Sequence, residues 1–350
     1  MFVIYLHMVG VIFCSGVFFS IYILIHPVLI SLGLNFFSVS LLCIITGVLI
    51  NNTITLSDTF SSGIQFCKKN LLQLGIVLLG SRLSFYEVGS FGLMAIPFVL
   101  ITFVTVAIFT YLLMKIFLDN KNTIMLISIG TAICGITAIL ACAPFTKAKD
   151  NEIAYATFVI SIIGTIALLT YPYISYELFN NYTNQVGIFL GTSIHDTGQV
   201  IASSFIYNAH YENSDVITIS TVTKLLRNSF LIILIPMLAW RYSDSGKFNY
   251  YHNIKNSFPL FVIGFLFLSV MRSSGDYVFF STQSMETWNS VLQINNFLTF
   301  VLLNIALVAL GLSVNLKSLK IIGLKPLFIG FTLSIIILIV NVFSIKNFLN

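Results

Sequence analysis

The stretch GTSIHDTGQV, Gly191 to Val200, places a histidine, an aspartate and a glutamine inside a strongly apolar region of the chain. Two glycines and three small hydroxyl residues accompany them. An ionisable side chain in a membrane-spanning helix is costly, since insertion scales give about 2.5 to 3.5 kcal/mol for an Asp at the helix centre. We therefore expect this segment to line a polar site near mid-membrane instead of facing lipid.

The composition of the whole chain agrees with that interpretation. Of 350 residues, 57% are hydrophobic and 8% are charged, whereas a soluble domain has about 25% charged residues. A helix needs about 20 apolar residues to cross the ~30 Å hydrocarbon layer of a bilayer. The pattern predicts an all-α polytopic membrane protein with about 10–11 transmembrane helices. The expected spans cover residues 2–25, 34–50, 68–82, 89–117, 122–144, 152–173, 185–207, 216–240, 257–271, 288–312 and 325–346.

We expect one transmembrane domain, residues 1–350, in the cytoplasmic (inner) membrane of a bacterium. A polar loop, residues 241–257, would join two halves, 1–240 and 257–350. More lysines and arginines fall in the even-numbered loops than in the odd-numbered ones, which favours a cytoplasmic N-terminus.

Two internal similarities suggest a repeat. LLQLGIVLLG, Leu71 to Gly80, aligns without gaps to LLNIALVALG, Leu302 to Gly311, in spans that cross in opposite directions. That orientation is typical of inverted-topology transporters. GTAICGITAILA, Gly130 to Ala141, also matches GTSIHDTGQVIA, Gly191 to Ala202, although these two spans would run in the same direction. Either one of them is re-entrant, or both are independent small-residue breaks.

The segment TAICGIT is a candidate break in a helix. Its glycine, Gly135, weakens a helix by about 1 kcal/mol relative to Ala, and Thr131, Cys134 and Thr137 around it are small or hydroxyl residues. Small residues also permit close helix packing, so packing and a broken helix both remain open. In the second reading, free N–H groups would point into a cavity, because irregular backbone at membrane depth is tolerated only when it is buried in protein or lines water.

Two further groups complete the candidate site. In the opening stretch, Ser193, His195, Asp196 and Gln199 supply hydrogen-bonding or ionisable side chains. Lys224 and Arg227 are three residues apart and share one helix face. They would form an inward-facing cationic face, or would mark a late start of their span. Because helix N-termini attract anions, the combination favours a small-anion site.

The leading hypothesis is a secondary transporter that moves a small anion by alternating access, coupled to protons or to exchange. No GxxxxGK[ST] motif is present, so the chain itself shows no nucleotide site. An intramembrane enzyme using His195 and Asp196 is an alternative, but HExxH and GxSxG motifs are absent. An anion channel is a third reading, separable by single-channel current.

The sequence predicts no catalytic residue, cofactor or metal site. The net charge of +5 comes from scattered lysines and arginines, so no nucleic-acid partner is expected. The five cysteines include no CxxC pair, and we interpret them as small buried hydrophobic residues. The expected partners are the bilayer, a small anion and a coupling proton, and a homodimer is left open.

Ordered sequence blocks resemble the bacterial YeiH-like family, commonly labelled sulfate exporters. The resemblance runs from about Gly75 to Asn228 and returns in LGLSVNLKSL near the C-terminal end. The blocks are GIVLLGSRLSFYEVG, GTAICGITAILACAPFTKAKDNEIAYA, GTIALLTYP, GTSIHDTGQVIAS and TVTKLLRN.

The resemblance implies inverted repeats with discontinuous helices and a sulfate or sulfonate-type substrate. The implied site blocks fall on Thr131, Cys134, Gly135 and Thr137, on Ser193 to Asp196, and on Thr223 to Arg227. Leu226 stands where the family motif has Thr, a change expected to affect substrate preference and not the fold.

Overall fold

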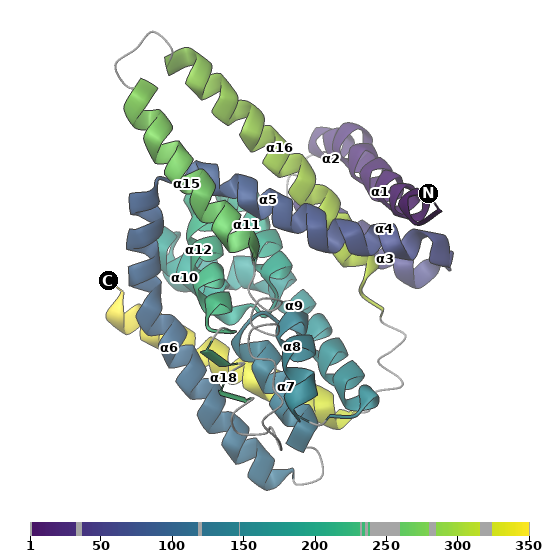
Figure 1. Cartoon of the computed structure of the whole chain (residues 1–350), viewed down its shortest axis with the longest axis vertical. Helices are drawn as coiled ribbons and strands as arrows, with labels where there is room; N and C mark the ends of the chain where they lie inside the picture. The colour runs from purple at the N-terminus through teal and green to yellow at the C-terminus, as the bar shows by residue number, and fades with distance from the viewer. Residues whose placement is uncertain are drawn as a thin grey trace. The chain divides into compact units, whose positions relative to one another are not determined.

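The computed structural model describes residues 2–32, 37–117, 121–146, 148–231, 233–234, 237–238, 260–279, 285–315 and 324–349. Within these ranges the chain is helical almost throughout and holds no strand, which confirms the all-α prediction (Figure 1). The polar loop 241–257 lies outside the described residues, so the division into halves 1–240 and 257–350 stays a prediction.

Six helical segments are long and apolar enough to cross a membrane. A shorter apolar helix, α3 (Val39–Thr53), adds to them. Two of the expected spans, 122–144 and 185–207, are each divided into two shorter helices, as a protein with discontinuous helices requires. The six segments are Met8–Ser31, Phe85–Ile116, Asp150–Phe179, Leu260–Phe279, Met285–Leu312 and Leu324–Phe348.

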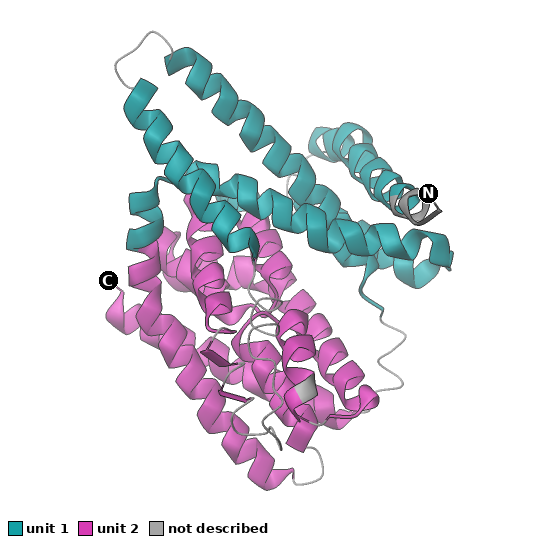
Figure 2. Ribbon diagram, in the orientation of Figure 1, with its two compact units in different colours: residues 1–90, 208–212, 260–317 teal, residues 91–207, 213–259, 318–350 magenta. Residues whose placement is uncertain are grey.

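The chain forms two compact units, each assembled from separate stretches of sequence (Figure 2). Unit 1 comprises residues 1–90, 208–212 and 260–317, and unit 2 comprises residues 91–207, 213–259 and 318–350. The elements of unit 1 are α1 (Phe2–Ser20), η1 (Ile21–Ile25), α2 (His26–Ser31), α3, η2 (Asp58–Phe60), α4 (Ser61–Phe66), η3 (Cys67–Leu71), α5 (Leu72–Leu79), η4 (Gly80–Arg82), α15 (Leu260–Phe279) and α16 (Met285–Leu312). Those mainly in unit 2 are α6 (Phe85–Ile116), α7 (Lys121–Ala132), α8 (Ile136–Thr146), α9 (Asp150–Phe179), α10 (Thr183–Ser193), α11 (Thr197–Tyr211), α12 (Asp215–Ser229) and α18 (Leu324–Phe348).

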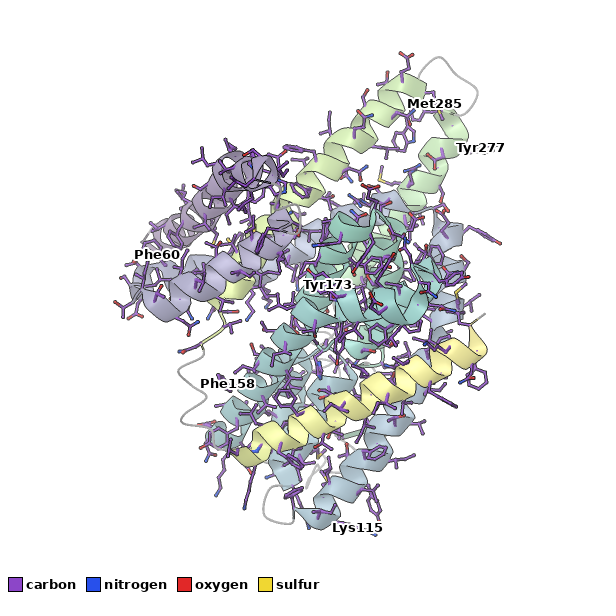
Figure 3. All side chains as sticks on the ribbon, turned by 180° about the vertical axis from the view of Figure 1, so that it is seen from behind. Phe60, Lys115, Phe158, Tyr173, Tyr277 and Met285 are labelled. Atoms are coloured by element: carbon purple, nitrogen blue, oxygen red, sulfur yellow. The ribbon has the colours of Figure 1, made fainter. Side chains whose placement is uncertain are left out.

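Unit 1 is packed through small residues on α16. A Cβ added to Gly47 of α3 would lie 3.0 Å from the Gly311 Cα, so the two backbones nearly touch. The two segments of the proposed repeat lie on α5 and α16, which pack together where Gly75 faces Leu303. That contact does not establish a repeat, which stays a prediction. Figure 3 labels Tyr277, in the last turn of α15, and Met285, the first residue of α16.

Unit 2 has an apolar core between α7, α8, α9 and α18, with Ile124, Ile160 and Leu333 fully or almost fully buried. Helix α10 packs along α12 and also contacts α9. A Cβ at Gly187 would lie 2.6 Å from the Ile219 side chain, and one at Gly191 would lie 2.6 Å from the Thr223 Cβ. This small-residue face lets the two helices approach closely, as in membrane helix pairs generally.

Candidate functional site

The first break in unit 2 separates α7 from α8. Helix α7 ends at Ala132 and α8 begins at Ile136, with turn residues between them. Gly135 has a φ of +68°, and its N–H donates to the Gly130 carbonyl at 2.9 Å. A residue with a Cβ is strained in this left-handed conformation, whereas glycine is not. The break in TAICGIT is therefore confirmed, whereas the expectation that its freed N–H groups point into a cavity stays a prediction.

The second break separates α10, which ends at Ser193, from α11, which begins at Thr197. Asp196 caps α11, because its Oδ1 accepts a hydrogen bond from the Gly198 N–H at 2.9 Å. The Gln199 side chain in turn bonds back to the backbone of Asp196, because its Oε1 accepts a hydrogen bond from the Asp196 N–H at 3.3 Å. This reciprocal pair resembles a capping box, which satisfies backbone donors at a helix start. Asp196 is partly exposed, whereas the residues on either side of it are buried.

The two breaks fall at matching positions of the aligned segments 130–141 and 191–202. Ala132 aligns with Ser193, and each ends a helix; Ile136 aligns with Thr197, and each begins one. The breaks also meet in space, because a Cβ on Gly135 would lie 3.4 Å from Asp196 Oδ2. We call residues 133–135 and 194–196 together the junction.

Lys224 joins the two sides of the junction. Its Nζ donates to the Ile133 carbonyl at 2.8 Å and to the Ile194 carbonyl at 2.9 Å, and these two residues occupy aligned positions. A third hydrogen bond reaches the His195 carbonyl. An ammonium group has three donors, so all three are used. The side chain is fully buried.

Arg227 binds backbone carbonyls in the last turns of α7 and α10, the helices that precede the two breaks. Its Nε donates to the Ala132 carbonyl at 2.7 Å, and its Nη1 donates to the Thr192 carbonyl at 2.6 Å. Nη2 also donates to the Thr131 carbonyl. The C-terminal end of a helix carries about −0.5 elementary charge, so two half-helix ends stabilise a buried cation. Among the residues that the structure describes, neither Arg227 nor Lys224 has a carboxylate ion-pair partner.

Polar side chains tie the second break to α18 and α6. His195 Nε2 lies 2.8 Å from Ser334 Oγ, and Ser193 Oγ accepts from Asn341 Nδ2 at 3.0 Å. Thr102 Oγ1 then donates to Asn341 Oδ1 at 2.9 Å. Sequence reasoning missed Ser334, Asn341 and Thr102. The signal was present in Asn341, an amide within the apolar run IIILIVNVF.

Four buried polar atoms near the junction have no hydrogen-bond partner among the described residues. They are Thr131 Oγ1, His195 Nδ1, Thr223 Oγ1 and Asn228 Oδ1. Buried polar groups are normally paired, so these atoms are candidates for contact with a bound molecule.

Most of the predicted site residues thus come together in unit 2. Gln199 also reaches α9, where its Nε2 donates to the Ser161 carbonyl at 3.2 Å. Cys134 is buried within the first break. Thr137 is exposed on the first turn of α8 and does not join the buried cluster. A substrate-binding role stays a prediction for Thr131, Cys134, Gly135, Thr137, Ser193, His195, Asp196, Gln199, Lys224 and Arg227.

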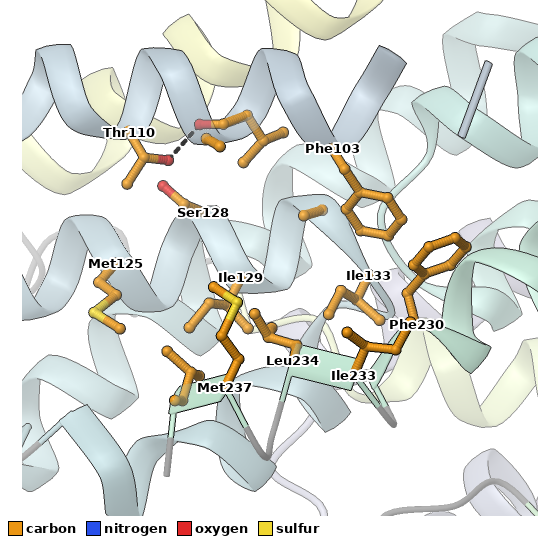
Figure 4. Close-up of a pocket in the computed structure, with 14 residues that line it drawn as sticks. Phe103, Thr110, Met125, Ser128, Ile129, Ile133, Phe230, Ile233, Leu234 and Met237 are labelled. Atoms are coloured by element: carbon orange, nitrogen blue, oxygen red, sulfur yellow. Dashed lines mark hydrogen bonds between the residues drawn. The ribbon is translucent and has the colours of Figure 1, made fainter. Parts of the chain in front are cut away.

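An apolar cavity of about 350 Å³ lies between α6, α7 and residues near the C-terminal end of α12, and its lining reaches Ile133 of the junction (Figure 4). Among the described residues that line it, only Thr110 and Ser128 carry hydroxyls, and these donate to the Val106 and Ile124 carbonyls of their own helices at 2.6 Å and 2.8 Å. The other described lining residues are apolar and come from α6, from residues 125–133, and from Phe230, Ile233, Leu234, Met237 and Leu238. The cavity therefore does not suit a charged substrate.

Comparison with known sequences places the chain among bacterial membrane proteins. The profile of the family described as Conserved hypothetical protein 698 matches residues 11–330. The UPF0324 membrane protein of Fusobacterium nucleatum is 32% identical over 296 residues, covering 82% of this chain and 84% of the relative. The UPF0324 inner membrane protein YeiH of Escherichia coli K12 is 31% identical over 302 residues, covering 85% and 82%. No solved structure matches the chain.

Proposed function

The chain belongs to the Conserved hypothetical protein 698 family of UPF0324 membrane proteins, and we propose that it is a secondary transporter of a small anion. It is a multi-pass protein of the inner membrane. The proposed substrate is sulfate or a sulfonate-type oxyanion, and the proposed mechanism is alternating access coupled to protons.

The observation that carries the proposal is the junction of the two broken helices. Helices α8 and α11 begin directly after the junction residues, at Ile136 and Thr197, so the N-termini of both helices lie at the junction. Transporters commonly place substrates near mid-membrane between half-helices, with the positive N-terminal ends directed at anionic groups. The meeting of two breaks is difficult to explain as packing alone, because each interrupts the helical hydrogen bonds that a membrane segment needs.

The charge at the junction supports an anion as the cargo. Lys224 and Arg227 use hydrogen bonds to hold carbonyl groups, yet their two positive charges still act over several ångströms in a low-dielectric interior. Asp196 supplies one negative charge. The hydroxyls of Thr131 and Thr223 could donate to an oxyanion from buried positions.

Asp196 suggests how proton coupling would work. Its carboxylate caps α11 and adjoins Gly135 at the start of α8, so it occupies the region in which a substrate anion would be attracted. Like charges repel, so protonation of Asp196 would favour entry of the anion. His195 is the second candidate proton carrier, because an imidazole can take up a proton and its Nδ1 has no hydrogen-bond partner among the described residues.

The test is uptake of radiolabelled sulfate, sulfite, a sulfonate and bicarbonate into proteoliposomes with and without a proton gradient. We expect saturable uptake and counterflow of at least one sulfur oxyanion, stimulated by a proton gradient. Asp196→Asn should retain binding while losing the pH dependence of transport, and Asp215→Asn, an exposed carboxylate at the start of α12, is the matched control. Absence of saturable uptake for all four anions would contradict the proposal, and resolvable unitary currents would indicate a channel.

His195→Gln separates the two candidate proton carriers. Glutamine can hydrogen-bond but cannot titrate, so a wild-type pH profile in this variant would exclude His195 and leave Asp196. Loss of pH dependence in His195→Gln, with Asp196→Asn unchanged from wild type, would assign the proton to His195 instead.

A further inference from the structure

Helices α1 and α4 of unit 1 touch through glycines. A Cβ added to Gly10 would lie 2.6 Å from the Gly63 Cα and 2.6 Å from the Phe60 carbonyl oxygen. Such distances leave no room for a side chain, so the two backbones are in direct contact there. This close approach determines what lies one helical turn farther along each segment.

A cysteine follows each of these glycines by four residues, in GVIFC (Gly10 to Cys14) and in GIQFC (Gly63 to Cys67). Residues four apart lie on the same face of a helix, and α1 runs in the same direction as α4 and η3 (Figure 1). The contact that joins the glycines therefore also brings the cysteines together. The Cys14 and Cys67 thiols lie close enough to interact with each other. Both side chains have no exposed surface.

We propose that Cys14 and Cys67 are a site of reversible oxidation that forms a disulfide between α1 and η3. A disulfide needs Cα atoms within about 4.4 to 6.8 Å and Cβ atoms about 3.5 to 4.5 Å apart, a range open to helices whose backbones approach as closely as they do at Gly10 and Gly63. The absence of a CxxC motif does not bear on this pair, since the two cysteines are far apart in sequence.

The oxidant in this reaction is a peroxide. One thiolate attacks a peroxide oxygen, which forms a sulfenic acid and releases one water after protonation. The second sulfur attacks the sulfenic sulfur, which forms the S–S bond and releases a second water. Two thiols and one hydrogen peroxide therefore give one disulfide and two waters, and a dithiol reductant reverses the change. The predicted topology places Lys68 and Lys69, next to Cys67, on the cytoplasmic side, where thiols are normally kept reduced.

The experiment uses the full chain in membrane vesicles, with Cys43, Cys134 and Cys142 replaced by Ala. After treatment with hydrogen peroxide, the protein is denatured and its free thiols are counted by gel shift with a maleimide–polyethylene glycol reagent. We expect that neither thiol reacts with the maleimide after peroxide treatment, and that both react again after reduction with dithiothreitol. The matched control keeps Cys14 and Cys43, another fully buried cysteine of unit 1, and carries Cys67→Ala; it should keep two reactive thiols.

Two results would overturn the proposal. One is persistence of both thiols in the Cys14/Cys67 protein after peroxide, and the other is equal loss in the Cys14/Cys43 control, which would mean unselective oxidation. Peptide mass mapping of the oxidised wild-type chain provides a measurement that needs no substitution. It should find the Cys14 and Cys67 peptides joined, with two hydrogens lost, and separate peptides would count against the pair.

Discussion

Lys224 and Arg227 donate to the same acceptor, the main-chain carbonyl of Ile194, at 2.9 Å and 3.1 Å. The two cations are three residues apart on α12 and so project from one face. A carbonyl oxygen has two lone pairs, so the Ile194 oxygen can accept one hydrogen bond from each of the two cations. The junction is thus held by a cationic face whose acceptors are backbone atoms of two broken helices.

Lys224→Gln should destabilise the protein and not only weaken anion binding. Each hydrogen bond to a charged group contributes about 1.5 to 3 kcal/mol, and a shorter neutral side chain would leave at least one buried carbonyl unpaired. Thermal unfolding in detergent should show a clear fall in Tm. Lys115→Gln, at an exposed end of α6 (Figure 3), is the control and should lower Tm far less, because it loses only an exposed contact with the Tyr111 ring. Equal Tm values for the two variants would contradict a stabilising role for the Lys224 hydrogen bonds.

Arg227→Lys separates charge from hydrogen bonding. Lysine keeps the positive charge but lacks the planar five-donor fork, so it cannot reach Ala132, Thr192 and Thr131 together. We expect a loss of stability of about 2 kcal/mol or more, with anion affinity reduced less than in Arg227→Gln. Isothermal titration with sulfate and denaturant unfolding measure the two effects, and identical affinity losses in both variants would refute a role for the charge itself.

Gly135→Leu should abolish transport while the chain still inserts. The left-handed backbone alone costs a residue with a Cβ about 1 to 2 kcal/mol, and the new side chain would enter the space beside Asp196 and Ile160. Gly16→Leu is the control, because a Cβ at Gly16 meets nothing within 4 Å. Normal uptake by Gly135→Leu would mean that the break is not part of the transport path.

Gly164→Ala should disturb the cap of α11 from a different helix. A Cβ at this position of α9 would lie 2.0 Å from Gln199 Oε1, so the amide that accepts from Asp196 must move. Gln199→Ala removes the obstacle, and the double variant should therefore be more stable than the sum of the two single changes predicts. Strict additivity of the Tm shifts would show that Gly164 and Gln199 do not interact.

Asn341→Ala should loosen the second break from α18. It removes the partners of Thr102 and Ser193 at a fully buried position, and an unpaired buried polar group costs about 1 to 3 kcal/mol. Asn347→Ala, an exposed amide on the same helix, controls for helix propensity. The measurement is Tm in detergent, together with sulfate uptake; a loss no greater than that of Asn347→Ala would exclude the network.

The breaks were predictable from sequence because their causes are local. A glycine among small residues marked the first, and Asp196-x-x-Gln199 could have been read as a capping pair before a helix. The partners of Lys224 were not predictable in this way, since Ile133 lies 91 residues away and accepts through its backbone. Every residue has a backbone carbonyl, so a carbonyl partner has no signature in the sequence. The spacing of Lys224 and Arg227 therefore predicted two inward-facing cations but not the carbonyl groups that they bind.

The contact between Cys14 and Cys67 illustrates the same limit for side chains. Each segment shows only a glycine and a cysteine four residues apart, a pattern too short to indicate a partner. Spacing along one helix predicts which residues share a face, whereas the choice of the opposing helix depends on the packing of the whole unit.

The dependence of both breaks on Lys224 also has a consequence for how the chain is made. During synthesis the residues that form α7, α8, α10 and α11 are made before those of α12. Until α12 is made, the carbonyls of Ile133 and Ile194 lack the Lys224 ammonium that binds them. Both interrupted helices are therefore without this stabilising contact at that stage. Chains truncated before residue 224 and released from the ribosome should therefore remain sensitive to proteolysis at residues 133–135 and 194–196, whereas chains that include α12 should be protected there.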